Sequence, residues 1–145
     1  MNFVAKKFGE LNLTELYEIL KVRSQIFILE QKMHCQDMDG VDFEARHFFI
    51  EQNGEILAYL RAFYTDSSKN AVRIGRVLSK THGVGLGTDM ILKSISDIKK
   101  NMPCKSICLD SQTHAIGFYE RFGFKVISEE FLEEGVMHVK MELGI

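Results

Sequence analysis

The hydrophobic pattern of the first 46 residues predicts one strand followed by one long helix. Residues 3–7 predict a short edge strand. Asn12 followed by Glu15 is typical of a capping box, in which two side chains bind free backbone N–H groups at a helix start. Hydrophobic residues then recur at helical spacing, at Leu13, Leu16, Leu20 and Phe27. We expect this helix to run to Glu30, with an irregular polar segment at residues 31–46.

The next segment carries the clearest hairpin signal of the chain. Residues 47–52 and 55–64 are rich in β-forming residues, and Asn53-Gly54 joins them. Both central positions of a two-residue hairpin turn favour positive φ, which asparagine and glycine tolerate well. A turn at residues 67–70 leads to a further run at residues 72–79, so the pattern predicts an antiparallel meander of three strands.

The second half of the chain alternates helices with strands. The expected elements are a helix from Thr88 to about Lys100, a buried strand at 106–110, a short helix from Ala115 to Phe122, and final strands at 124–128 and 136–143. Pro103 and Gly123 are the stop signals of the two helices. A helical crossover between two strands makes them parallel. The pattern therefore predicts an α/β (α+β) fold with a mixed central sheet of about six or seven strands flanked by helices.

Length and composition describe an ordinary domain. The 145 residues suit a single domain, residues 1–145, with one core. Hydrophobic residues make up 46% and charged residues 26%, and the formal net charge is −2 at pH 7. Nucleic-acid binding would favour a basic surplus, and a membrane span would need about 20 consecutive apolar residues. We therefore expect a cytoplasmic protein that binds neither nucleic acid nor membrane, and we recognise no signal peptide.

Neither the cysteines nor the acidic residues follow a metal-site pattern. The three cysteines, at positions 35, 104 and 108, have no C-x-x-C spacing and fit reduced thiols. The acidic stretch from Asp37 to Asp42 fails the EF-hand spacing, because Gly40 is fourth in it and an EF-hand places glycine sixth. We expect no bound metal.

A glycine-rich segment, residues 83–87, lies between a predicted strand and a predicted helix. Glycine lets the backbone approach a ligand closely, and free N–H groups at a helix start attract an anion. The segment is no Walker loop, because it has no Gly-Lys pair, and no dinucleotide fingerprint, because position 88 is threonine. It predicts either a phosphate-binding loop of another kind or a tight turn without chemical function.

A second motif, Ala115-x-x-Phe118-Tyr119-x-x-x-Gly123-Phe124, follows the glycine loop by about thirty residues. With the order of elements, the two motifs resemble the GNAT family of acyl-CoA-dependent N-acetyltransferases over nearly the whole chain. Further segments resemble the ElaA-like branch of that family: Phe27-x-x-Glu30-Gln31, Asp37-x-Asp39-Gly40-x-Asp42, His47, Gly75-Arg76-Val77 and Glu134-Gly135-x-x-His138-x-x-Met141. One departure is His82, which stands where the family loop usually opens with Arg or Gln. We expect it to weaken the binding of the pyrophosphate.

The resemblance implies acetyl-CoA as co-substrate and a GNAT fold whose sheet splays at the cofactor-binding strand. The pyrophosphate of coenzyme A suits the N–H groups of residues 84–88, and its pantetheine arm can pair with the strand at 77–79. Gly75 predicts either a bulge in that strand or a packing glycine. The expected cofactor-binding residues are Val77, Leu78, Ser79, His82, Gly83, Val84, Gly85, Leu86, Gly87, Thr88, Gln112, Phe118 and Tyr119.

Acetyl transfer to an amine requires a base for the amine, stabilisation of the carbonyl oxygen, and an acid for the departing thiolate. The backbone N–H of Val77 is the expected oxygen-stabilising donor. Tyr119 matches the usual acid of the family, although Phe118-Tyr119 is also typical of a plain aromatic core. The candidate bases are Glu30, Asp39, His47 and His138, and a water chain is the alternative. We name Tyr119, His138 and Glu30 as catalytic candidates, because histidine titrates near neutrality and Glu30 lies near a helix end.

We therefore expect an N-acetyltransferase that acetylates a primary amine of an unidentified small molecule or peptide by direct attack in a ternary complex. Residues 37–42 are expected to close over the amine, where their carboxylates either attract a cation or pair with Arg23, Arg46 or Arg76. One alternative is a non-catalytic acyl-CoA-binding sensor of the same fold, suggested by His82 and by a strand at 72–79 without a carboxylate. The other is an interaction module without CoA binding. The exposed terminal strands are compatible with a homodimer.

Overall fold

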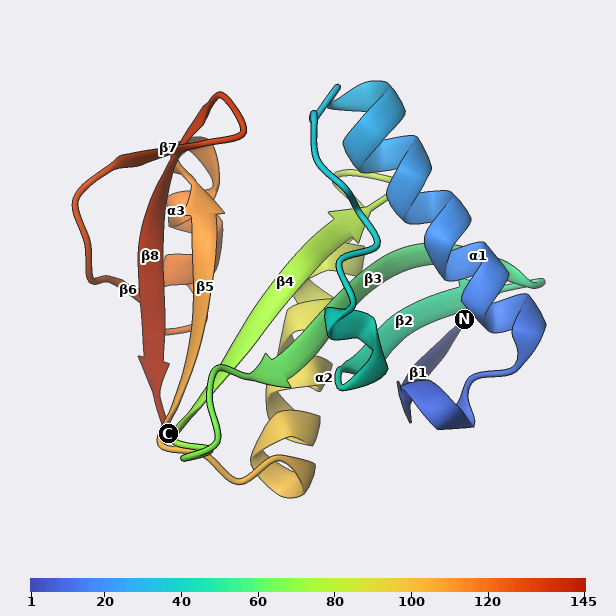
Figure 1. The fold of residues 1–145 in the computed structure, drawn as a ribbon, viewed down its shortest axis with the longest axis horizontal. Helices are drawn as coiled ribbons and strands as arrows, with labels where there is room; N and C mark the ends of the chain where they lie inside the picture. The colour runs from blue at the N-terminus through green and yellow to red at the C-terminus, as the bar shows by residue number, and fades with distance from the viewer.

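A mixed sheet of eight strands runs through the computed structural model, which describes all residues 1–145 (Figure 1). The strands are β1 (Asn2–Lys7), β2 (Arg46–Gln52), β3 (Glu55–Tyr64), β4 (Ala71–Ser79), β5 (Ser106–Gln112), β6 (Lys125–Val126), β7 (Phe131–Glu133) and β8 (Val136–Gly144). Their order is β1-β2-β3-β4-β5-β8-β6, and β7 also pairs with β8. Only β4 and β5 are parallel neighbours, which confirms the predicted crossover.

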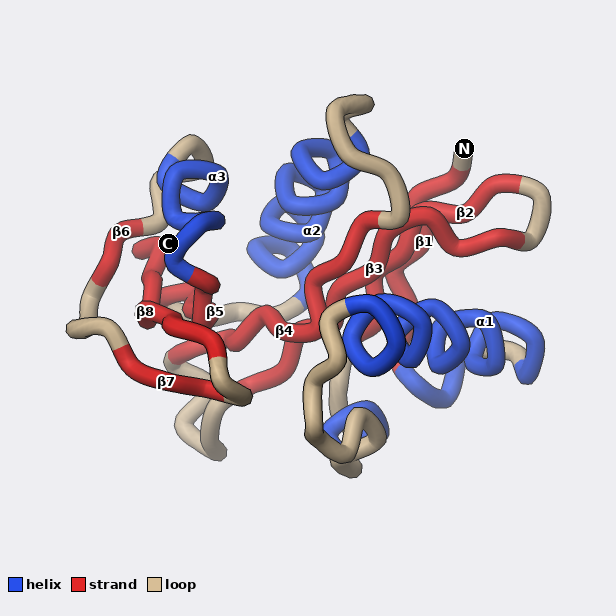
Figure 2. Tube along the Cα trace, turned by 90° about the horizontal axis from the view of Figure 1, so that it is seen from above, coloured by secondary structure: helices blue, strands red, loops and turns tan.

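Helices cover both faces of the sheet (Figure 2). One face carries α1 (Leu13–Arg23), which continues as the π-helical segment η2 (Ser24–Glu30). The other carries α2 (Leu86–Asn101), the crossover from β4 to β5, and the short α3 (Ile116–Glu120). The 3₁₀ turns are η1 (Phe8–Glu10), η3 (Val41–Phe43) and η4 (Thr113–Ala115). None of the helices combines the length and the apolar character that a membrane crossing requires.

Alternate residues of the central strands bury their side chains on opposite faces of the sheet. Phe48 lies in the larger hydrophobic cluster with the inner side of α2, and its neighbour Phe49 lies in the smaller cluster with α1. Leu60 and Tyr59 divide in the same way between the two clusters. Because both faces are covered, the sequences of these strands are nearly continuous hydrophobic runs.

The N-terminal elements agree with the sequence pattern. The predicted hairpin is confirmed, since Asn53 and Gly54 adopt φ values of 53° and 78°. The first helix ends at Glu30 as predicted, but its last seven residues widen into a π-helix. No residue type marks such a widening in the sequence, so the hydrophobic spacing alone could not predict it.

The C-terminal strands differ from the prediction at two places. The strand predicted at 124–128 is reduced to Lys125–Val126, because Phe124 turns into the core and is 2% exposed. An unpredicted strand, β7, brings the sheet to eight strands. It joins β8 through Glu134-Gly135, whose φ values are 50° and 75°. Glutamate is uncommon at positive φ, so this turn carried a weak sequence signal.

The sheet opens between β4 and β5, which pair only where Ala71–Arg73 meets Ser106–Cys108. Beyond Arg73 the two strands diverge (Figure 1). On its other edge β4 carries a bulge: Arg61 pairs with Gly75 and Tyr59 with Leu78, so two residues of β4 oppose one of β3. A Cβ on Gly75 would meet no atom within 4 Å, which excludes a packing glycine there. The predicted splay and bulge are therefore both present.

The capping box of α1 supports the first testable prediction. Asn12 Oδ1 accepts a hydrogen bond from Glu15 N at 2.7 Å, and Glu15 Oε1 accepts one from Asn12 N at 2.9 Å. Asn12→Ala should lower the free energy of unfolding by about 1 kcal/mol, because it removes the acceptor for the Glu15 amide. Urea denaturation measures the change. Asn12→Ser, which keeps a capping oxygen, is the control, and equal losses for both variants would contradict the capping role.

Candidate active site

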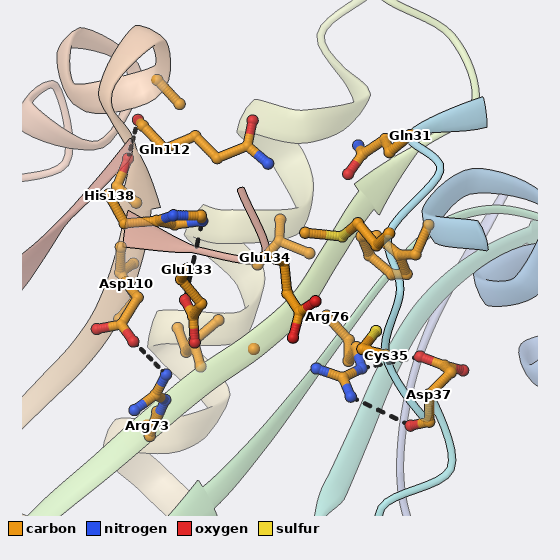
Figure 3. A pocket seen from close by; sticks show the side chains of 18 of the residues that line it. Gln31, Cys35, Asp37, Arg73, Arg76, Asp110, Gln112, Glu133, Glu134 and His138 are labelled. Atoms are coloured by element: carbon orange, nitrogen blue, oxygen red, sulfur yellow. Dashed lines mark hydrogen bonds and ion pairs between the residues drawn. The ribbon is translucent and has the colours of Figure 1, made fainter. Parts of the chain in front are cut away.

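A cavity of about 500 Å³ lies where β4 and β5 diverge. Its walls come from β4, β5, the segment after α1, the helical turn that contains Tyr119, and the turn between β7 and β8 (Figure 3). Gly75 lines it with open space above its Cα, so β4 presents bare backbone to the cavity at that point. The cavity is thus built from segments that are far apart in the sequence and meet only because the sheet opens.

The glycine-rich segment follows β4 and ends on an uncapped helix. Gly83 and Gly85 adopt φ values of 79° and 80°, a region that side chains disfavour. Helix α2 begins at Leu86, two residues earlier than predicted, with Gly85 as its N-cap and no side chain bound to its free amides. The first bond of this turn runs from Asp89 N to Gly85 O, at 3.0 Å. The amides of residues 86–88 therefore lack intrahelical partners, and free amides at a helix start favour an anion.

Gly87 has a packing role besides its place in this loop. A Cβ at position 87 would lie 3.4 Å from Cζ of Phe118, an ordinary contact distance, so α2 and the Phe118 ring pack against each other at this point. The guanidinium of Arg121 lies 5.4 Å from the centre of the Phe118 ring, and its Nη2 is 3.5 Å from Oγ1 of Thr88. Sequence reasoning missed this cation beside the helix start. Its signal was a basic residue two positions after Tyr119, on the helix that the motif had already placed near the loop.

Tyr119 lies at the inner wall of the cavity and is 8% exposed. Burial raises its pKa to about 12, which keeps the hydroxyl protonated at neutral pH. Its ring packs edge-on against Phe118 and Phe124, and its hydroxyl makes no hydrogen bond within the protein. The aromatic-core role and the acid role are therefore compatible, because the ring packs in the core while the residue borders the cavity.

His138 was predicted on the polar face of the last strand, yet it is only 5% exposed. The unpredicted strand β7 accounts for this, since the Phe131 ring stacks on His138 with centroids 6.0 Å apart. Nδ1 lies 2.8 Å from the Val136 carbonyl oxygen. A carbonyl only accepts, so Nδ1 donates and Nε2 of the neutral ring is left as an acceptor. Oε2 of Glu133 is 3.9 Å from Nε2 (Figure 3).

The other candidate bases are placed less favourably. Glu30 is exposed and does not line the cavity. His47 is 1% exposed, its Nε2 donates to the Asp42 carbonyl at 2.9 Å, and its Nδ1 accepts from the Tyr59 hydroxyl at 2.7 Å. Asp39 lines the cavity, but Arg61 binds both of its oxygens, at 2.8 and 2.6 Å. Of the four candidates, only His138 combines a place in the cavity with a free acceptor atom.

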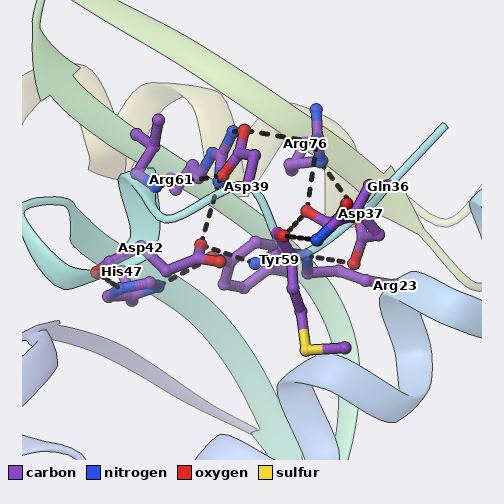
Figure 4. Close-up of polar contacts among 11 residues, drawn as sticks. Arg23, Gln36, Asp37, Asp39, Asp42, His47, Tyr59, Arg61 and Arg76 are labelled. Atoms are coloured by element: carbon purple, nitrogen blue, oxygen red, sulfur yellow. Dashed lines mark hydrogen bonds and ion pairs between the residues drawn. The ribbon is translucent and has the colours of Figure 1, made fainter.

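Three arginines and three aspartates form a charge network beneath the cavity (Figure 4). Arg23, fully buried on α1, binds Asp37 and Asp42 at 3.0 and 2.7 Å. Arg61 on β3 binds Asp39 and Asp42 at 2.6 and 3.0 Å. Of the two alternatives for the acidic stretch, arginine pairing is the one present, although Arg61 was missed and Arg46 instead binds Asp97 at 2.7 Å. No group of His, Cys, Asp or Glu side chains is arranged to hold a metal ion.

The same network fixes the bulge in β4. Arg76 is the bulge residue with φ of 53°, and its Nε binds Oδ1 of Asp37 at 2.9 Å. Positive φ at a non-glycine residue costs on the order of 1 kcal/mol or more, so it persists only where the surroundings hold it. Arg76 therefore pairs with the acidic loop, and this pairing orients the backbone that follows at Val77.

The pKa values of the network follow from its geometry. The hydrogen bond from Arg61 is the main reason why the pKa of Asp39 is lowered. Burial by itself would raise the pKa of Asp42, but Arg23 and Arg61 outweigh it and the pKa is lowered. Burial also lowers the pKa of His47, which favours the neutral ring. All three shifts favour the network in its native charge state near neutral pH.

Comparison with known sequences decides the family. The profile of the "Acetyltransferase (GNAT) domain" matches residues 20–145. The chain belongs to the GNAT family. As a GNAT protein it is similar to ElaA of Escherichia coli K12, with 33% identity over 137 residues that cover 92% of this chain and 90% of ElaA. The predicted resemblance to the ElaA-like branch is thereby confirmed.

Solved GNAT structures share the fold. The crystal structure of E. coli ElaA superimposes with a TM-score of 0.91 at 31% identity and covers 97% of each chain. An acyl-CoA N-acyltransferase from Pseudomonas aeruginosa gives a TM-score of 0.90 at 30% identity and covers 98% of this chain and 99% of its own. A GNAT acetyltransferase from Elizabethkingia anophelis, solved with acetyl-CoA bound, has a TM-score of 0.69 at 13% identity, covers 99% of this chain and 97% of its own, and shares the fold alone.

The predicted cofactor-binding residues fall into three groups around this GNAT cleft. Val77, Gln112 and Tyr119 line the cavity. The side chain of Leu78 is buried against α1, so only its backbone can contact a ligand. The remaining residues lie along the loop from β4 to α2 or in the α3 packing: Ser79, His82, Gly83, Val84, Gly85, Leu86, Gly87, Thr88 and Phe118. His82 is exposed on that loop.

The buried histidine makes stability depend on pH. The folded-state pKa of His47 is lowered, so below about pH 6.5 the unfolded chain binds a proton that the folded protein does not. The free energy of unfolding should therefore fall as the pH decreases from 7 to 5, before the aspartates titrate. Urea denaturation across this range measures the slope. His47→Gln should flatten it and His34→Gln, at an exposed position, should not; a slope that survives His47→Gln would contradict the assignment.

Proposed function

We propose that this GNAT protein transfers the acetyl group of acetyl-CoA to a primary amine by direct attack in a ternary complex. The observation that carries the proposal is the open seam between β4 and β5. At one end it meets the uncapped start of α2, and at its wall stands Tyr119, whose hydroxyl has no protein partner. Family membership supports the reaction class, and the E. anophelis structure supports the co-substrate.

The chain offers groups that match the parts of coenzyme A. The free amides of residues 86–88 would bind the pyrophosphate, and Arg121 adds a positive charge beside them. The edge of β4 beyond Arg73 has no partner strand, so its backbone groups can pair with the amides of the pantetheine arm. Bound in this way, acetyl-CoA supplies an activated acetyl thioester at the level of the cavity.

The cavity residues would then handle the protons. An alkylammonium with a pKa near 10.4 must first be deprotonated, which costs about 4–5 kcal/mol at pH 7. Nε2 of His138 would accept this proton, which its place in the cavity and the hydrogen bond of Nδ1 to the Val136 carbonyl support. The nitrogen forms a bond to the carbonyl carbon, the Val77 N–H stabilises the negative charge on the oxygen, and the carbon–sulfur bond breaks. Tyr119 donates its hydroxyl proton to the departing sulfur, and the second proton lost by the acylated nitrogen passes through solvent to reprotonate Tyr119.

Tyr119→Phe tests the acid role. The variant keeps the ring that packs against Phe118 and Phe124, so the fold and CoA affinity should persist. Loss of the donor should lower kcat by about 100-fold, the lower end of general acid contributions. Acetyl-CoA consumption against a panel of amines measures kcat, and calorimetry measures the CoA Kd. Tyr17→Phe, at an exposed position on α1, is the matched control.

The outcomes separate the candidate functions. Unchanged kcat in Tyr119→Phe would remove the acid role while leaving the enzyme. CoA binding without turnover of any amine would instead make the protein a non-catalytic acyl-CoA sensor. Absence of CoA binding would overturn both readings and favour an interaction module.

His82→Arg tests the cofactor loop independently of turnover. Arginine at this exposed position adds a positive charge close to the helix start, where phosphate oxygens accept charge-assisted hydrogen bonds. The CoA Kd should fall roughly threefold to tenfold, and the gain should shrink at high salt. Calorimetry at two salt concentrations measures both effects. Asn101→Arg, which adds the same charge at the far end of α2, should leave the Kd unchanged; an equal gain there would show a general charge effect.

A further inference from the structure

The cavity carries more negative than positive charge, and most of that charge is already paired. Its acidic residues are Asp37, Asp39, Asp110, Glu133 and Glu134, and its basic residues are Arg73 and Arg76. Asp37 and Asp39 belong to the network with Arg23, Arg61 and Arg76, in which Asp42 completes three carboxylates against three guanidiniums. Asp110 pairs with Arg73. The unpaired negative charge therefore sits at the turn between β7 and β8.

Glu134 is the residue that distinguishes this turn. Its side chain points into the cavity from the hairpin tip (Figure 3), and it has no ion-pair partner. Its φ of 50° is unusual for glutamate, and the following Gly135 completes the turn. Glu133 beside it has only His138, at 3.9 Å, as a basic neighbour. Both carboxylates are exposed to solvent at the rim of the cavity, and neither forms an ion pair with an arginine or lysine.

Polar groups without protein partners also line this cavity. Tyr119 is more than nine-tenths buried, lines the same space, and its hydroxyl has no partner in the protein. The amide group of the half-buried Gln112 also lines the cavity without a protein partner, and that of the exposed Gln31 lies at the cavity's edge (Figure 3). Polar groups left unpaired in a recessed space favour a ligand that completes their hydrogen bonds.

We propose that the acceptor is a small aliphatic amine with a second cationic group, a diamine or polyamine, and that Glu134 binds the second cation. This inference rests on the proposed acetyl transfer and names its substrate class. One amine enters near His138 and Tyr119 and is acetylated. The other stays protonated, and its ammonium donates to the Glu134 carboxylate, with Glu133 adding to the negative field.

The ion pairs of the two arginines in the cavity also favour a cationic acceptor over an acidic one. Arg73 and Arg76 would be the natural ligands of an acidic acceptor, but Asp110 and Asp37 already hold them. An acceptor with a carboxylate would therefore meet Glu134 and Glu133 without a free cation to bind. The cavity thus attracts a second positive charge and repels a negative one.

The balance of the reaction is that of ordinary acetyl transfer. The carbon–nitrogen bond forms and the carbon–sulfur bond breaks. The nitrogen loses two protons, one to solvent through His138 before attack and one after attack, which replaces the proton that Tyr119 gives to the thiolate. The second ammonium takes no part in bond changes. Its binding to Glu134 is present in both ground state and transition state, so the effect of Glu134 should appear in KM rather than in kcat.

The first experiment compares matched acceptors with acetyl-CoA and the wild-type protein. The probes are 1,3-diaminopropane, putrescine, cadaverine and spermidine, the monoamines propylamine, butylamine and pentylamine, and 4-aminobutanoate. At least one di- or polyamine should exceed its monoamine in kcat/KM by tenfold or more, and 4-aminobutanoate should fall below butylamine. Monoamines turned over as well as every diamine would overturn the inference and leave the acetyltransferase function standing. No turnover of any amine would overturn both.

The second experiment removes the negative charge of Glu134, which is proposed to bind the second cation. Glu134→Gln should raise KM for the preferred diamine at least tenfold, with kcat, monoamine kcat/KM and CoA Kd unchanged. The matched control is Glu130→Gln, which removes the same charge from an exposed position outside the cavity. Equal effects of the two variants, or a Glu134→Gln loss that is the same for monoamines and diamines, would overturn the role of Glu134. Glu133→Gln is less decisive because Glu133 lies beside His138.

Discussion

Backbone N–H and C=O groups need hydrogen-bond partners, and beyond Arg73 the strand β4 has a partner strand on only one side. The rest of the architecture follows from this gap. Helix α2 covers one face of the sheet and α1 the other, so the open seam between β4 and β5 becomes a recess rather than a flat exposed edge. Its walls come from both halves of the chain. Its free backbone groups are those with which a ligand carrying amide groups would pair, in the manner of an added strand.

The charge network holds the recess in this shape. Arg23, Arg61 and Arg76 come from three different elements and meet on one acidic loop. Buried charges are costly unless each is paired, so removing one member leaves its neighbours uncompensated and loosens the loop and the bulge together. The network therefore links the packing of α1 to the backbone geometry of β4 at Val77. Its contribution lies in specifying one arrangement rather than in adding much to stability.

Local patterns predicted the elements well, and long-range contacts explain what they missed. The Asn53-Gly54 hairpin and the capping box at Asn12 act over a few residues, and the sequence shows them directly. The burial of His138 depends on β7, whose turn has glutamate at positive φ and so gave little signal. Arg61 pairs with residues about twenty positions away, across the sheet. Such pairings depend on which elements lie side by side in the folded protein, and the pattern of a single sequence does not predict these long-range contacts.

The hairpin of β7 and β8 has a consequence for how such a protein can change. Leu132, Val136 and Met137 are exposed, and β7 pairs in the sheet with β8 alone, along three residues. The exposed side chains at the hairpin tip belong to neither hydrophobic cluster, although Val139 and Met141 further along β8 belong to the larger one. New side chains at the hairpin tip therefore cost little folding free energy, provided that Gly135 keeps its positive φ. The hairpin tip is thus a tolerant rim on a packed frame, and it is a natural place to graft or randomise side chains.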